Sequence, residues 1–108
     1  MASDFVWIYI TASSRDEALA IGRELVRGRL AACANVIDGL TSVYWWDGKV
    51  NEDPEAALVV KTRAGLADAV VARVKELHSY TCPCVVALPI LAGNPDFLAW
   101  IRDETRAE

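Results

Sequence analysis

The hydrophobic and polar positions of the chain follow two periods, one typical of strands and one typical of helices. Residues 5–10 form a continuous apolar run of β-branched and aromatic side chains, which predicts a strand in the middle of a sheet. Ser13 and Ser14 follow as candidate N-caps, and apolar residues at helical spacing then predict a helix that ends at Arg27-Gly28. The chain therefore begins with a strand and a helix.

A long β-hairpin is predicted next. Residues 31–46 are rich in strand-forming side chains, and Gly39 among them predicts a bend or bulge. Asp47-Gly48 is a strong hairpin signal, because a type I′ turn requires positive φ at both central positions. Residues 49–63 return as the third strand, with Pro54 expected at a bulge or on an unpaired edge.

The rest of the chain predicts a second helix, a fourth strand and a terminal helix. Apolar residues at helical spacing cover residues 66–77, and residues 82–90 form an apolar run framed by prolines. Asn94 as N-cap and Pro95 at the first helical position predict the start of the last helix. The order β-α-β-β-α-β predicts a ferredoxin-like α+β fold with an antiparallel sheet, a long central hairpin and a C-terminal helix.

The 108 residues suit one domain, so we expect the ferredoxin-like domain to span residues 1–108. Each hairpin strand of roughly 14 residues would span on the order of 46 Å, whereas a compact chain of this size is about 34 Å across. The hairpin tip carries Tyr44, Trp45 and Trp46, and an isolated two-stranded ribbon is marginal in water. We therefore predict that other subunits cover the tip; the alternative is that the tryptophans fold back on their own chain.

Charge and cysteine content exclude several partners. The net charge is −4 and the basic residues form no block, which argues against nucleic acid. No run approaches the roughly 20 apolar residues of a membrane span, and no secretion signal is visible. The three cysteines are an odd number, which favours free thiols and a cytoplasmic location.

A set of motifs runs in order along nearly the whole chain: 29–36 (RLAACANV), 42–49 (SVYWWDGK), 61–63 (KTR), 74–80 (VKELHSY), 86–90 (VALPI), 93–95 (GNP) and 98–101 (LAWI). Together they resemble the CutA family of divalent-cation tolerance proteins. The resemblance implies a homotrimer of ferredoxin-like subunits with sheet pairing between them. It also implies a role in tolerance of divalent cations, copper above all, and a cytoplasmic place in bacteria.

One segment departs from the family pattern. The family usually has His-Pro-Tyr-Glu-x-Pro-Glu after the second helix, and residues 78–84 here read His-Ser-Tyr-Thr-Cys-Pro-Cys. Thr81 and Cys84 stand where the family has acids, so a role built on those carboxylates does not carry over to this chain.

Cysteines and the single histidine are the candidate metal ligands. On an extended strand, Cys82 and Cys84 would place both sulfurs on one face, with Cα atoms roughly 6.5–7 Å apart. This spacing is long for a disulfide and suits two thiolates on copper(I) or zinc. His78 would be a third donor, and Cys33 matches the family's cysteine. The alternative is that these side chains only fill space.

A ligand cleft between subunits is the second candidate site. We expect it to involve Tyr44, Trp45, Trp46, Glu52, Lys61 and Tyr80. No nucleophile and acid accompany the only histidine, so we expect no enzymatic activity. The functions left open are a trimeric protein that binds or buffers copper or another divalent cation, a signalling module like the PII proteins that binds a small ligand and a protein partner, and a stable scaffold.

Overall fold

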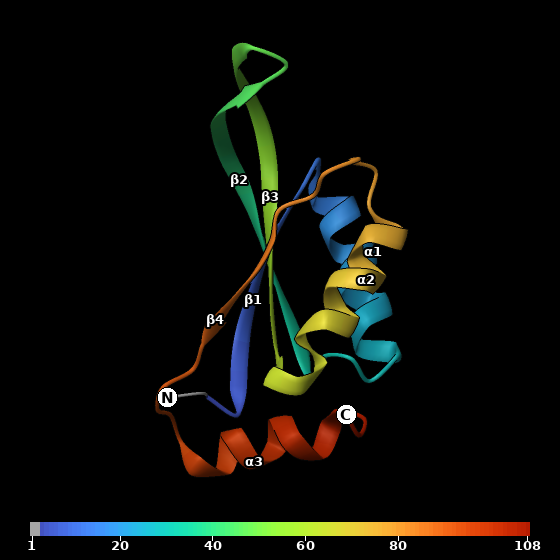
Figure 1. The fold of residues 1–108 in the computed structure, drawn as a ribbon, viewed down its shortest axis with the longest axis vertical. Helices are drawn as coiled ribbons and strands as arrows, with labels where there is room; N and C mark the ends of the chain where they lie inside the picture. The colour runs from blue at the N-terminus through green and yellow to red at the C-terminus, as the bar shows by residue number, and fades with distance from the viewer. Residues whose placement is uncertain (1–2) are drawn as a thin grey trace.

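The computed structural model describes residues 3–108, and its centre is one open sheet of four antiparallel strands in the order β2-β3-β1-β4 (Figure 1). In chain order the elements are β1 (Phe5–Ala12), α1 (Arg15–Arg27), β2 (Cys33–Trp46), β3 (Lys49–Arg63), a 3-10 turn (Ala64–Leu66), α2 (Ala67–Leu77), β4 (Val85–Pro89) and α3 (Pro95–Glu104). The predicted ferredoxin-like α+β fold is therefore confirmed.

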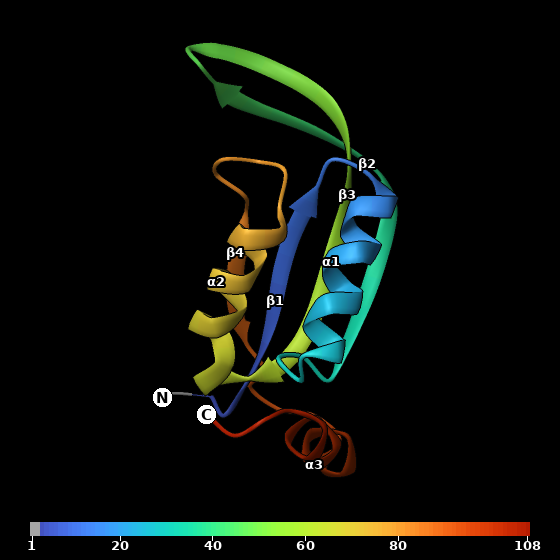
Figure 2. The same ribbon diagram turned by 90° about the vertical axis from the view of Figure 1, so that its right-hand side faces the viewer.

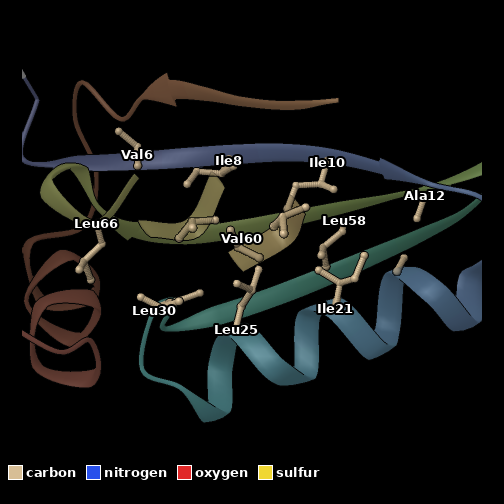
Figure 3. Close-up of a cluster of buried hydrophobic side chains, with 14 of the residues drawn as sticks. Val6, Ile8, Ile10, Ala12, Ile21, Leu25, Leu30, Leu58, Val60 and Leu66 are labelled. Atoms are coloured by element: carbon tan, nitrogen blue, oxygen red, sulfur yellow. The ribbon is translucent and has the colours of Figure 1, made fainter. Parts of the chain in front are cut away.

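Helices α1 and α2 lie side by side on the same face of the sheet (Figures 1 and 2). Period-two alternation in β1 and β3 points every second side chain at these helices. Burial of this apolar face supplies the main driving force for folding. The fully buried centre of the cluster includes Ile8, Ile10, Ile21, Leu25, Leu58 and Val60 (Figure 3).

Helix α3 crosses the lower end of the molecule as drawn in Figure 1, away from the main core. It buries Ile101 completely, in a second small cluster with Phe5 and Ala32. Both predicted N-caps are confirmed, because Ser14 accepts a hydrogen bond from the Glu17 N–H and Asn94 accepts one from the Asp96 N–H. Local capping signals therefore fixed where these two helices begin.

The hairpin extends beyond the rest of the sheet, as its length predicts. Strand β1 pairs with β3 only as far as Ala12 and Ala56, and beyond that point β2 and β3 pair only with each other. The longest dimension of the molecule is 44 Å, against 28 and 23 Å in the other directions. We call the projecting part, residues 40–55, the ribbon.

The bend and the turn in this hairpin are also confirmed. Pairing slips between Ile37 and Leu40, and Gly39 adopts a φ of +80° there, a conformation that favours glycine. At the tip, Asp47 and Gly48 have φ values of +54° and +71°, as a type I′ turn requires. Pro54 lies in the ribbon, where the edge of β3 that faces β1 elsewhere has no partner strand.

Two predicted boundaries are wrong. The fourth strand begins at Val85 instead of residue 82, so Cys82 and Cys84 lie in the connector before it. Pro83 has no N–H to donate to a strand ladder, which is one physical reason for the late start. The second strand begins at Cys33 instead of residue 31. Within residues 3–108, no helix is long and apolar enough to cross a membrane.

Candidate functional site

A cleft of about 700 Å³ lies between the ribbon and the connector that joins α2 to β4, residues 78–84. Figure 2 shows the ribbon curving over this connector. The ribbon lines the cleft with Ser42, Val43, Tyr44, Trp46 and Glu55. The connector lines it with Ser79, Tyr80, Thr81, Cys82 and Cys84, and Thr11 lies between the two.

Strand alternation decides which aromatic side chains of the ribbon face the cleft. Ser42, Tyr44 and Trp46 are spaced two residues apart on β2, so their side chains share one face. The Tyr44 hydroxyl donates a hydrogen bond to Oδ2 of Asp53 on the neighbouring strand, at 2.5 Å. This bond, with the negative charge of Asp53, raises the pKa of Tyr44.

His78 anchors the start of the connector. Its Nε2 lies 2.7 Å from the Thr11 carbonyl oxygen, which can only accept, so Nε2 carries the proton. Its Nδ1 accepts from the Tyr80 N–H at 3.0 Å, and the rings of His78 and Tyr80 lie 4.6 Å apart. Both ring nitrogens are therefore engaged within the subunit, and the imidazole holds the connector against β1.

Glu17 anchors the same connector to the beginning of α1. Its Oε1 accepts hydrogen bonds from the Ser13 N–H and hydroxyl, and its Oε2 accepts one from the Ser79 N–H at 2.9 Å. Burial raises the pKa of this carboxyl, but the hydrogen bonds from Ser13 and Ser79 outweigh it and lower the pKa to about 2. The carboxylate therefore stays ionised at every physiological pH.

Tyr80 joins the connector to the base of the ribbon. Its hydroxyl donates to Oε2 of Glu55 at 2.8 Å. Burial of the ring, together with the bond to Glu55 and its charge, raises the pKa of Tyr80 strongly. The phenol is neutral at physiological pH and holds one wall of the cleft to the other.

Cys82 and Cys84 both line the cleft and both are exposed free thiols. They do not share the face of a strand as predicted, because β4 begins after them. His78, the predicted third donor, has both ring nitrogens hydrogen-bonded within the subunit, and its role as a metal ligand stays a prediction. In the part of the chain that the structure describes, no three His, Cys, Asp or Glu side chains gather closely enough to hold a metal ion.

The other predicted site residues lie elsewhere. Cys33 is at the far end of β2, opposite Lys61, whose Nζ donates to Asn35 Oδ1 at 2.7 Å and lies 3.8 Å from the Cys33 sulfur. Trp45 and Glu52 alternate with the cleft residues and therefore lie on the opposite face of the ribbon. Within one subunit the cleft includes Tyr44, Trp46 and Tyr80 but excludes Trp45, Glu52 and Lys61, whose part in a cleft between subunits stays a prediction.

Two carboxylates of the site were not singled out from the sequence. Glu17 follows the N-cap Ser14 by three residues, and the pattern Ser-x-x-Glu is a capping signal that marks this side chain. Glu55 carries no comparable local signal, because its partner Tyr80 is 25 residues away in the chain.

Comparison with known proteins adds an independent line of evidence. The family model described as CutA1 divalent ion tolerance protein matches residues 6–104. The divalent-cation tolerance protein CutA of Thermus thermophilus is 48% identical over 98 residues, which are 91% of this chain and 95% of that protein. Protein CutA 1 of Oryza sativa, described as chloroplastic, is 41% identical over 92% of this chain. The alignment spans only 56% of the rice protein, about half of its length.

The structural comparison agrees. The crystal structure of CutA1 from Oryza sativa superposes with a TM-score of 0.95 and 38% sequence identity. It covers 99% of this chain and 98% of the rice chain. The likeness therefore includes the long hairpin and the C-terminal helix as well as the central sheet.

Proposed function

We propose that this chain, which belongs to the CutA1 divalent ion tolerance protein family, forms a homotrimer that binds or buffers copper or another divalent cation. Family membership supports the general role in divalent-cation tolerance. The observation that carries the metal-binding part is the pair of exposed thiols, Cys82 and Cys84, on one cleft wall.

Thiol chemistry favours a soft metal ion at this pair. Thiolate sulfur prefers copper(I) and zinc over hard cations such as magnesium. The two cysteines are separated only by Pro83, which restricts the backbone between them, and the connector before them is anchored through His78. Because no third His, Cys, Asp or Glu side chain lies close enough among residues 3–108, we expect two-coordinate copper(I), or a site completed by another subunit.

Exposed apolar surface supports the trimer. The sheet face without α1 and α2 exposes Trp7, Val86 and Leu88 at 40%, 51% and 44%. The outer face of the ribbon exposes Trp45 and Val50 at 74% and 59%. Contiguous apolar surface of this kind marks protein interfaces. Light scattering after size exclusion should give three times the 11.8 kDa subunit mass, and a monomer at micromolar concentration would contradict the trimer.

Copper titration tests the thiol site. Reduced protein should bind copper(I) in competition with a coloured chelator, and Cys82→Ser with Cys84→Ser should remove that binding. Cys33→Ser is the matched control, because Cys33 lies at the other end of β2 next to Lys61, and it should leave copper affinity unchanged. Unchanged affinity in the double variant, or a loss in the control, would exclude the site at Cys82 and Cys84.

We place this function in the cytoplasm and expect no enzymatic turnover. The exposed thiols at Cys82 and Cys84 suit a reducing compartment, where they stay unpaired. The only histidine has both ring nitrogens bonded to backbone groups, which leaves it no role as a general base in this arrangement.

The cleft itself favours a second candidate function, a signalling module that binds a small ligand. A volume of about 700 Å³ with aromatic walls and fixed polar groups is typical of small-molecule sites. A ligand selective for the folded protein would raise its melting temperature, so a thermal-shift screen tests this function independently of copper.

A further inference from the structure

We propose that the cleft between the ribbon and the connector binds a small organic cation, such as a quaternary ammonium or alkylammonium compound. This inference names the ligand class for the second candidate function and does not require a bound metal. It rests on the aromatic walls, the carboxylates behind them and the sign of the charge along the cleft.

Aromatic faces on both sides of the cleft can surround a cation. Tyr44 and Trp46 come from the ribbon, with 40% and 54% of their surface exposed, and Tyr80 comes from the connector. The faces of such rings carry negative electrostatic potential and attract ammonium groups, most strongly where the cation is desolvated. Aromatic cages of this kind recognise quaternary ammonium ligands in general.

Within the described part of the chain, the one charged side chain that lines the cleft is acidic, and two further carboxylates lie close behind its walls. Glu55 lines it, Asp53 accepts the hydrogen bond of Tyr44, and Glu17 lies behind Ser79. Among residues 3–108, no lysine, arginine or histidine lines the cleft. Lys49 pairs with Trp46 at the tip of the ribbon and does not line it either.

The hydrogen bonds leave the carboxylates able to attract a cation. Glu55 and Asp53 each receive a bond from a neutral tyrosine hydroxyl at one oxygen, and no ion pair with a basic side chain is found for either among the described residues. The hydrogen bond to Asp53 is the main cause that raises the pKa of Tyr44, and burial is the main cause for Tyr80. The charge of Glu55 raises both pKa values further, which is consistent with negative potential in the cleft. An anion or a neutral polyol would gain no comparable charge complementarity.

Choline and its neutral carbon analogue, 3,3-dimethylbutan-1-ol, have nearly the same shape and differ in charge, so comparing their affinities tests the contribution of charge to binding. The native assembly, reduced and in EDTA, is titrated with each probe by calorimetry, and nitrogen–proton NMR spectra locate the site. Choline should bind saturably and at least about tenfold tighter than the alcohol. It should shift the amide signals of Ser42, Tyr44, Tyr80 and Thr81. Equal affinity for the two probes, or shifts confined to other surfaces, would overturn the proposal.

Matched variants test the named residues. Glu55→Gln keeps an acceptor for Tyr80 and removes one charge, so it should weaken choline binding about fivefold. Glu52→Gln removes the same charge from the opposite face of β3 and should change affinity less than twofold. Trp46→Leu should weaken binding about fivefold, and Trp45→Leu should not. Equal effects within either pair would overturn the site.

A further outcome separates this inference from the candidate function on which it rests. If the neutral alcohol or an anion binds in the cleft as tightly as choline, the ligand-binding function survives and the cationic ligand class is wrong. If no probe shifts the cleft signals and the thermal-shift screen finds no ligand, both are wrong.

Discussion

The two halves of strand β3 show how differently one strand can be used. Ala56–Val60 is buried between β1 and β2 under the two helices, and Val60 is completely inaccessible to solvent. Lys49–Glu55 continues the same strand into the ribbon, where Val50 is 59% exposed. Both halves have regular β pairing, so burial is set by the neighbouring elements and not by the strand itself.

The two regions of the molecule therefore differ in what they bury and what they expose. The described part of the chain outside the ribbon, which we call the body, buries its apolar side chains within a single chain. The ribbon exposes aromatic and apolar side chains, and covering them requires a ligand or another subunit. The outer face of the ribbon is mainly apolar, and its inner face carries the tyrosine and carboxylate pairs of the cleft. In the proposed trimer, the outer face of the ribbon would serve assembly and the inner face would bind the ligand.

The same substitution at two valines of β3 gives the largest expected contrast. Val60→Ala should lower the free energy of unfolding by about 2.5 kcal/mol, because it leaves a cavity in a fully buried cluster. Val50→Ala should cost less than about 0.5 kcal/mol in a monomer. In the proposed trimer Val50→Ala should instead lower the melting temperature in a concentration-dependent way. Urea unfolding measures the free energies, and thermal unfolding at two protein concentrations measures the melting temperatures. A small effect at Val60 would contradict the assigned core.

Loss of the Glu17 carboxylate should have the next largest effect on the free energy of unfolding. Glu17→Gln should cost about 2 kcal/mol at pH 7, clearly below the roughly 3 kcal/mol implied by the lowered pKa, because the side chain is 16% exposed and solvent screens its charge. The folded-state pKa is depressed from the ordinary 4.5 to about 2, so this stabilisation is complete above pH 4.5 and disappears as the pH falls through 2. The difference in free energy of unfolding between the parent protein and Glu17→Gln should therefore disappear over that pH range.

Asp16→Asn is the control for the pH experiment. Asp16 carries the same charge in the same helical turn but does not make the hydrogen bonds to Ser13 and Ser79. Its free energy of unfolding should differ from that of the parent protein by much less than for Glu17→Gln. A pH-independent loss at Glu17 would mean that the side chain acts through packing alone.

The junction between body and ribbon gives a smaller effect. Gly39 has a positive φ, and no atom lies within 4 Å of the position that a Cβ would take. Gly39→Ala should therefore cost about 1 kcal/mol through backbone strain only, and Gly39→Asn should cost less because asparagine tolerates this conformation better. Equal costs for the two variants in thermal unfolding would point to a cause other than strain.

The bond between connector and ribbon should give the smallest change in stability. Tyr80→Phe removes the hydrogen bond to Glu55 and should cost about 0.5 kcal/mol, because the Glu55 carboxylate can bond to water afterwards. Hydrogen exchange should nevertheless become faster in the connector while the core strands keep their protection. Unchanged exchange in residues 79–84 would show that Tyr80 does not hold the connector to the ribbon.

Much of the fold followed from short-range patterns. The caps at Ser14 and Asn94, the Asp47-Gly48 turn and the bulge at Gly39 each depend on a few adjacent residues, and all four are confirmed. The start of β4 was predicted wrongly, since the apolar character of residues 82–90 does not reveal where pairing with β1 begins.

The site was predictable only in part. Tyr44, Trp46 and Tyr80, predicted for a cleft between subunits, line a cleft within one subunit, and His78, predicted as a metal ligand, hydrogen-bonds to the Thr11 carbonyl. Strand alternation separates Trp45 from Trp46, and this separation could have been derived from the sequence once the hairpin register was known.

The sequence by itself determined the order of the elements, the length of the hairpin and the family, because these depend on periodicity, turn chemistry and motifs along the chain. Only the tertiary structure decided that Glu17 would hold Ser79 and that Tyr80 would meet Glu55. Those contacts join residues 62 and 25 positions apart, and their geometry depends on the path of the connector across the end of the sheet. Local patterns fix which segments become strands and helices, but packing between distant segments decides which side chains share a cleft.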